Sequence, residues 1–197
     1  GGIMLIAASI LQFIYFVKYR NIFYPLFAWL FLGAILTMVI STIISVINTW
    51  FYSKPQMYRV KHNFEPKVAV IIPTFGESIE MVLKTIESII SQNYPLKKLL
   101  LIVSDDAGNP ELKRQIQKIN QKSPNIIYHT PPHTSSILRI GDAKAGNLNS
   151  ALALVLTHYP DIKFVETRDA DDLVGDPNFL SYVIGSLLAN KKLSFVQ

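Results

Sequence analysis

A stretch of 29 residues without a charged side chain, residues 22–50, constrains this chain more than any other feature. It is longer than the roughly 20 apolar residues that a helix needs to cross a bilayer. A shorter apolar run, residues 3–17, precedes it, and the only charges in residues 1–52 are Lys18 and Arg20 between the two runs. Aromatic residues near both ends of the longer run are typical of membrane–water interfaces. The sequence therefore predicts two transmembrane helices joined by a tight turn. A cleaved signal peptide is the alternative, disfavoured because no basic region precedes the first run and a longer run follows.

Flanking charge predicts which side of the membrane carries the rest of the chain. The second run is followed by four basic residues, Lys54, Arg59, Lys61 and Lys67. The turn before it carries only two. This asymmetry favours the cytoplasmic side, so we expect a multi-pass protein of the plasma membrane with a cytoplasmic domain. Residues 53–66 are predicted to be an interfacial linker. They place apolar side chains among basic ones, which fits either a segment lying on the lipid surface or a solvated linker; the apolar ones are Met57, Tyr58, Val60 and Phe64.

The composition of the remaining residues indicates one soluble domain and excludes several chemistries. Residues 53–197 carry 17 basic and 14 acidic side chains, too even a balance for a strongly basic nucleic-acid-binding domain. The chain contains no cysteine. Disulfides, zinc–thiolate sites and thiol catalysis are therefore excluded within it.

An alternation of strand-like and helix-like segments defines the fold class of residues 67–197. Apolar runs rich in β-branched residues predict strands buried on both faces, and helical spacing of apolar residues follows each one. This order predicts an α/β domain with a mostly parallel sheet and helices on both faces. The predicted strands are 68–74, 98–104, 125–129, 162–167 and the beginning of a fifth at 193–197, and the predicted helices start near 78, 109, 146 and 176. Because the last strand has nothing to cover it, we expect the domain to be incomplete and the protein to be longer.

Polar side chains gather where the predicted strands end. In such sheets ligands bind at the carboxyl ends of the strands, near the point where the strand order reverses. Residues after the first, second and fourth strands, and before the third helix, are therefore the candidate binding residues: Thr74, Phe75, Glu77, Asp105, Asp106, Lys144, Asn147, Asp169 and Asp171.

Asp169 and Asp171 form a D-x-D pattern that predicts a metal site. Residues two apart in an extended segment point the same way, so the two carboxylates are expected to converge on one cation. Hard oxygen ligands without cysteine or clustered histidine favour Mg²⁺ or Mn²⁺. A calcium EF-hand loop is excluded, because Val174 and Leu180 stand where that loop needs glycine and glutamate. A solvated acidic turn remains the alternative.

The other candidates each have two interpretations. Asp105 and Asp106 either stabilise a turn through local hydrogen bonds or accept hydrogen bonds from a base or ribose. Phe75 either stacks on that base or packs at a strand end. Lys144 precedes a predicted helix, where free N–H groups attract anions, and is either a phosphate neighbour or simply solvated. No P-loop and no dinucleotide fingerprint occurs in the chain.

Four segments together resemble the membrane-bound, processive glycosyltransferases of family 2, in particular the cellulose synthase-like enzymes. They are IIPTFGE (71–77), SDDAG (104–108), DAKAGNLNSAL (142–152) and ETRDADD (166–172). The resemblance implies a Rossmann-like GT-A domain that binds a nucleotide-sugar, of which residues 67–197 are the first half. It implies a lipid-embedded enzyme that transfers sugar from UDP-sugar to a polysaccharide acceptor, with further membrane or export subunits as partners.

The resemblance also implies a role for each matching residue. One of Asp105 and Asp106 contacts the uracil or ribose, Phe75 lines the base pocket, and the turn from Lys144 to Asn147 lies near the nucleotide. Asp169 and Asp171 bind the diphosphate through the metal. The general base and the acceptor motif of the family lie beyond residue 197, so no catalytic residue is expected in this chain. Two alternatives remain: a membrane-anchored nucleotide-binding regulator without catalysis, and a phosphatase of the haloacid dehalogenase type, which also places D-x-D after a strand.

Overall fold

The computed structural model describes residues 7, 10, 11, 14, 18, 23–51, 56–122, 125–133 and 135–196, which fall into two compact units, Gly1–Pro55 and Gln56–Gln197. The first unit contains one long helix, α2 (Phe23–Trp50). Its residues from Trp29 to Trp50 are long and apolar enough to cross a membrane, with a mean hydropathy of 2.5. The second predicted span is therefore a helix. The first predicted span, residues 3–17, lies almost entirely outside the described residues.

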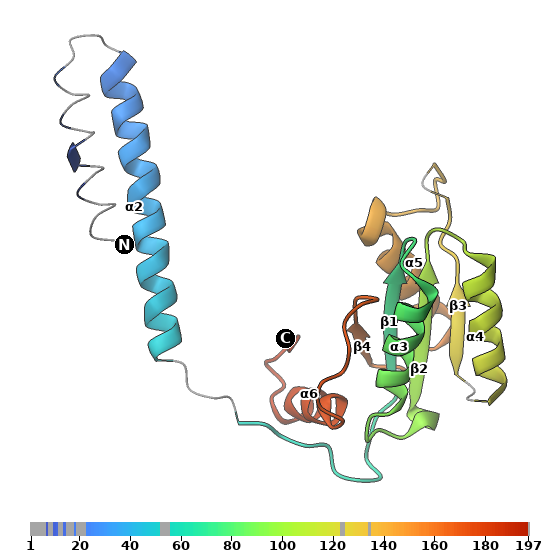
Figure 1. The fold of residues 1–197 in the computed structure, drawn as a ribbon. Helices are drawn as coiled ribbons and strands as arrows, with labels where there is room; N and C mark the ends of the chain where they lie inside the picture. Colours follow the sequence, from blue (N-terminus) through green and yellow to red (C-terminus); the bar gives the residue numbers. More distant parts are fainter. Residues whose placement is uncertain are drawn as a thin grey trace. The chain divides into compact units, whose positions relative to one another are not determined.

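The second unit is an α/β domain built on a parallel sheet, as predicted (Figure 1). Four strands lie in the order β3-β2-β1-β4, and every neighbouring pair is parallel. The elements in chain order are β1 (Val68–Thr74), α3 (Ile79–Ile90), the 3-10 helix η1 (Leu96–Lys98), β2 (Leu99–Asp105), α4 (Pro110–Lys122), β3 (Ile126–His129), α5 (Ala143–His158), β4 (Phe164–Thr167) and α6 (Phe179–Ala189).

The two central strands are buried along their whole length, which explains their continuous apolar sequences. All seven residues of β1 and all seven of β2 are buried. Alternate side chains of β1 enter two separate cores, because successive residues of a strand point to opposite faces. Val68, Val70 and Ile72 pack in the core formed with α3, α4 and α6, whereas Ala69 and Ile71 pack against α5. Helices therefore cover both faces of the sheet.

Local capping fixes where two of the helices begin. Ser78 accepts a hydrogen bond from the Met81 N–H at 3.2 Å, which satisfies a free donor in the first turn of α3. Asn109 accepts from the N–H groups of Glu111 and Leu112 at the start of α4, with Pro110 as the first helical residue. Both starts agree with the sequence prediction.

Three predicted boundaries differ from the structure. The helix predicted from residue 146 begins at Ala143, so Lys144 lies in its first turn rather than before it. The last helix begins at Phe179 rather than at residue 176. The predicted fifth strand is wrong for residues 193–196, which contain no strand. β-Propensity alone does not place a segment in a sheet.

The segment that follows the apolar helix packs on the domain over residues 56–66. Val60 is 8% exposed and belongs to the larger core, so its side chain is available neither to a lipid surface nor to solvent. Its N–H donates to the Ser181 carbonyl of α6 at 3.1 Å, and the Tyr94 hydroxyl donates to the Pro66 carbonyl at 2.7 Å. Met57 and Phe64 remain exposed.

One buried hydroxyl connects α3 to the segment after β4. Thr85 is fully buried, and its Oγ1 donates to the Ala170 carbonyl at 2.6 Å. Thr85→Val removes this donor while keeping the shape of the side chain, and it leaves the carbonyl buried without its partner. We expect a loss of about 1–3 kcal/mol in the free energy of unfolding. Chemical unfolding of the variant measures it, with Thr85→Ser as the control that keeps the hydroxyl. Equal stability of Thr85→Val and Thr85→Ser would show that the hydrogen bond contributes nothing.

Candidate functional site

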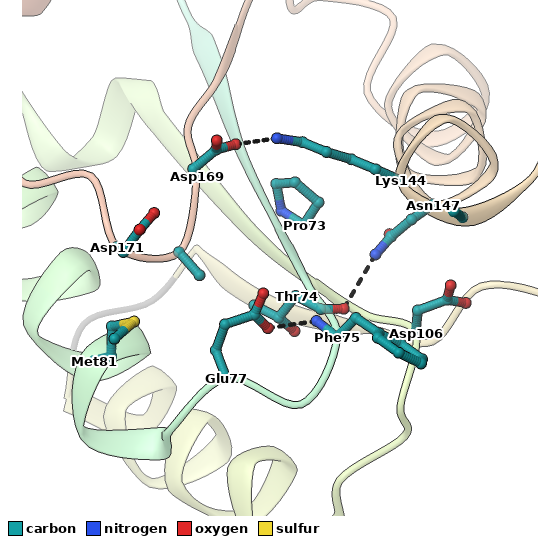
Figure 2. Close-up of a pocket in the computed structure, with 12 residues that line it drawn as sticks. Pro73, Thr74, Phe75, Glu77, Met81, Asp106, Lys144, Asn147, Asp169 and Asp171 are labelled. Atoms are coloured by element: carbon teal, nitrogen blue, oxygen red, sulfur yellow. Dashed lines mark hydrogen bonds and ion pairs between the residues drawn. The ribbon is translucent and has the colours of Figure 1, made fainter.

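A pocket of about 720 Å³ opens at the carboxyl edge of the sheet, where the strand order reverses between β1 and β4 (Figure 2). Eight of the nine predicted binding residues line it, and Asp105 does not. The lining residues come from the end of β1 and the start of α3, from the end of β2, from the first turns of α5 and from the segment after β4: Pro73, Thr74, Phe75, Glu77, Met81, Asp106, Ala143, Lys144, Asn147, Asp169, Ala170 and Asp171.

Asn147 ties α5 to the ends of the two central strands. Its Nδ2 donates to the Ser104 carbonyl at 2.8 Å and to the Thr74 carbonyl at 3.3 Å. The side chain is buried, and its Oδ1 has no hydrogen-bond partner in the described structure; the same holds for the Thr74 hydroxyl. Buried polar atoms are usually paired. These two pocket-lining groups are therefore available to a bound molecule.

Asp105 and Asp106 have different surroundings. Asp105 is 1% exposed, and its carboxylate accepts from the N–H groups of Ala107 and Asn109 and from the Tyr128 hydroxyl. Burial and this carboxylate raise the pKa of Tyr128 to about 12. Asp105 therefore stabilises the turn after β2, and of the two residues only Asp106 faces the pocket.

Arg139 is a residue of the site that the sequence did not single out. Its side chain is 1% exposed and forms a bidentate pair with Asp106, with N–O distances of 2.5 and 2.8 Å. This carboxylate raises the pKa of the Arg139 guanidinium. The guanidinium also donates to the Pro132 and Ala143 carbonyls at 3.0 and 2.9 Å. It thus joins the loop after β3 to the end of β2 and the start of α5.

Gly146 makes this arrangement possible. A Cβ at Gly146 would lie 2.1 Å from the Gly141 carbonyl oxygen and 2.6 Å from Arg139 Nε, distances that no side chain tolerates. The glycine of the KAGN segment therefore lets the loop and its arginine lie directly against α5.

Asp169 and Asp171 belong to a turn rather than to an extended segment. The Asp172 N–H donates to the Asp169 carbonyl at 3.1 Å, which defines the acidic turn, residues 169–172. Ala170 is 4% exposed and points into the core, so Asp169 and Asp171 on either side of it both line the pocket. The segment is therefore a turn, contrary to the expected extended geometry.

Two basic residues contact the acidic segment. Lys144 forms an ion pair with Asp169, and the two side chains meet across the pocket in Figure 2. Arg168 is buried and pairs with Glu166 and with Asp172. Asp169 therefore has a cationic partner within the chain. No hydrogen bond or ion pair of the Asp171 carboxylate occurs within the described part of the chain.

The remaining predicted residues shape the mouth of the pocket. Phe75 is 74% exposed, so its ring does not pack in the core. Its N–H donates to the carboxylate of Glu77, which bends this loop back on itself. Thr74 closes the base of the pocket, since it is buried at the end of β1.

Comparison with known proteins identifies the family. The family model described as glycosyl transferase family 2 matches residues 69–196. The chain belongs to glycosyl transferase family 2. This membership removes the phosphatase alternative.

The relatives in this family include polysaccharide synthases. The chain is 28% identical to glucomannan 4-beta-mannosyltransferase 1 of Cyamopsis tetragonoloba, over 85% of this chain and 32% of that protein. It is 28% identical to the UDP-forming cellulose synthase catalytic subunit of Pseudomonas fluorescens (strain SBW25), over 75% of this chain and 17% of that protein. The chain thus spans less than a third of the length of these relatives.

A solved structure shows the same fold. The mannosyltransferase of Pyrobaculum calidifontis, in complex with GDP-Man and Mn²⁺, superposes with a TM-score of 0.51 and 22% identity, over 71% of this chain and 37% of that one. The fold of residues 56–196 is therefore a GT-A-like α/β fold.

The buried pair of Arg139 and Asp106 makes a measurable prediction. Arg139→Gln leaves the largely buried Asp106 carboxylate without its counter-charge, and we expect a loss of about 3–5 kcal/mol in the free energy of unfolding. Adding Asp106→Asn removes the uncompensated charge and should recover part of that loss. Denaturant unfolding of the two single variants and the double variant measures the coupling. Strictly additive losses would contradict a direct interaction between the two side chains.

Proposed function

We propose that this chain is the donor-binding part of a membrane-bound, inverting glycosyltransferase that transfers a hexose from a UDP-sugar to a growing polysaccharide, as in β-glucan or cellulose synthesis. The observation that carries the proposal is that one pocket at the carboxyl edge gathers eight residues predicted from four separate segments. The names of the relatives support a polysaccharide product, and the UDP-forming relative supports a UDP-linked donor.

The base and ribose are proposed to bind beside β1 and β2. Phe75 offers an exposed ring for stacking on a base. The Asp106 carboxylate, held in place by Arg139, accepts hydrogen bonds from the base or ribose. The unpaired Thr74 hydroxyl and Asn147 carbonyl offer further polar contacts at the base of the pocket.

The diphosphate is proposed to bind between α5 and the acidic turn. Lys144, in the first turn of α5, adds a positive charge to a helix N-terminus, where anions are stabilised. The pocket otherwise carries four carboxylates, those of Glu77, Asp106, Asp169 and Asp171. A dianionic diphosphate beside so many negative charges needs a counter-ion.

A divalent cation fits this arrangement. Asp169 and Asp171 would hold Mg²⁺ or Mn²⁺ as hard oxygen ligands, and Asp171 has no competing partner among the described residues. No group of three or more acidic or histidine side chains suited to a metal occurs in the described residues. Water and phosphate oxygens would therefore complete the coordination, as is usual for Mg²⁺. The cation would stabilise the charge of the departing nucleoside diphosphate.

The general base that activates the acceptor hydroxyl is not assigned to this chain. Two further acids close to Asp169 and Asp171 in the chain, Glu166 and Asp172, are both engaged by Arg168. This is consistent with the expectation that the base belongs to another part of the protein. The polysaccharide acceptor and any export subunit are likewise proposed partners of the longer protein.

Substitution of the two aspartates tests the proposal. In the full-length protein, Asp169→Asn or Asp171→Asn should reduce sugar transfer by about a hundredfold or more, because the cation loses a charged ligand. The measurement is incorporation of radiolabelled sugar from UDP-sugars by membranes that contain the protein, followed by linkage analysis of the product.

Asp161→Asn is the matched control, because Asp161 is an exposed acid at the opposite edge of the sheet and pairs with Lys67. Near-normal transfer by either pocket variant with Mg²⁺ or Mn²⁺ present would overturn the metal assignment. Nucleotide binding by the wild type without any transfer would instead support the non-catalytic regulator. In a nucleotide-binding assay with the wild type, a preference for GDP over UDP would overturn the UDP assignment.

The proposed membrane arrangement has its own test. We expect a cytoplasmic domain, so a cysteine introduced by His62→Cys should be protected from an impermeant thiol reagent in intact cells and labelled after permeabilisation. The His62 side chain is 87% exposed and the chain has no cysteine of its own, so the labelling reports this position. The unsubstituted full-length protein is the control for cysteines elsewhere. Labelling in intact cells would place the domain outside.

A further inference from the structure

Residues 56–60, here called the strap, pass so close to α6 that the helix has no room for a side chain at Gly185. A Cβ at Gly185 would lie 2.1 Å from the Tyr58 carbonyl oxygen and 2.7 Å from its carbonyl carbon. Glycine in a helix interior costs about 1 kcal/mol relative to alanine. Close approach of the strap therefore explains why a glycine stands there.

Three further contacts hold the strap on α6. The Val60 N–H donates to the Ser181 carbonyl at 3.1 Å, and the Val60 side chain is buried in the same core as Leu180 and Ile184. The Arg59 guanidinium donates to Asn178 Oδ1 at 2.7 Å. The strap is therefore a packed part of the domain rather than a passive linker.

Side-chain contacts link α6, the helix that the strap contacts, to the acidic turn. The Arg168 guanidinium lies over the ring of Phe179, the first residue of α6, with its Cζ 4.9 Å from the centre of that ring. Arg168 in turn holds the Asp172 carboxylate at 3.1 Å. Ala170, between the two pocket aspartates, packs in the core that contains Val60.

We propose that the strap positions the acidic turn of the donor pocket through α6, with Gly185, Val60 and Arg59 as positioning residues. Only residues 51–55 separate the end of the apolar helix α2 from the strap. The segment that attaches the domain to its proposed membrane helix is thus the same segment that sets the geometry of Asp169 and Asp171. The effect on donor binding rests on the proposed function; the effect on the turn does not.

Gly185→Ala in the full-length protein tests the inference, with Gly175→Ala as the matched control. A Cβ at Gly175 meets nothing within 4 Å, although this glycine lies between the acidic turn and α6. We expect Gly185→Ala to displace the strap, so trypsin should cleave faster after Arg59. Hydrogen exchange of the amides of residues 168–172 should accelerate about tenfold or more. The dissociation constant of UDP with Mn²⁺ should rise several-fold. Gly175→Ala should leave all three unchanged.

Two results would overturn the inference. One is faster cleavage of the strap in Gly185→Ala with unchanged exchange at residues 168–172; the other is unchanged cleavage and exchange. If Gly185→Ala does not fold, Arg59→Gln removes only the contact with Asn178, and it should change exchange at the same amides in the same direction. Its failure to do so would equally refute the coupling. If the wild type binds no nucleotide, the proposed function fails while the exchange measurement still decides the role of the strap.

Discussion

Complete burial of the two central strands is the constraint on which the rest of the domain depends. Every residue of β1 and β2 is buried, and nearly all are apolar, so the strands themselves carry no side chain to the solvent. Groups that bind a polar ligand can lie only where these strands end. Because β1 and β2 are parallel, their carboxyl ends share one edge of the sheet. The Asn147 side chain of α5 donates hydrogen bonds to a backbone carbonyl of each strand there. The pocket follows from this geometry.

The same constraint explains what the sequence could predict. Continuous apolar runs identified four strands, capping residues such as Ser78 and Asn109 identified two helix starts, and strand ends identified the pocket residues. The fifth strand was predicted from local propensity alone, and its residues 193–196 are irregular. Pairing depends on a partner strand, which local composition does not describe. Neither interpretation of residues 53–66 buried Val60, because its partner in α6 lies more than a hundred residues away in the chain.

The contacts that shape the pocket are long-range, and so the sequence could not reveal them. Arg139 lies between Leu138 and Ile140 in the chain, yet it is buried on Asp106 while both neighbours are exposed. Lys144 and Asp169 belong to different elements, and their ion pair depends on how α5 meets the acidic turn. Spacing predicted that Asp169 and Asp171 converge. The structure shows that both line the pocket on either side of Ala170, which is anchored by its burial and by the hydrogen bond from the Thr85 hydroxyl to its carbonyl.

Lys144 connects this charge arrangement to the proposed chemistry. Its ammonium group offsets one of the pocket's carboxylates, that of Asp169. Both side chains are more than half exposed, so the pair contributes little stability and is easily exchanged. Under the proposed function, a cation on Asp169 and Asp171 would replace the ammonium there, and the freed lysine would lie beside the diphosphate. One flexible basic residue thus suits both states of the pocket, which a buried residue such as Arg139 could not do.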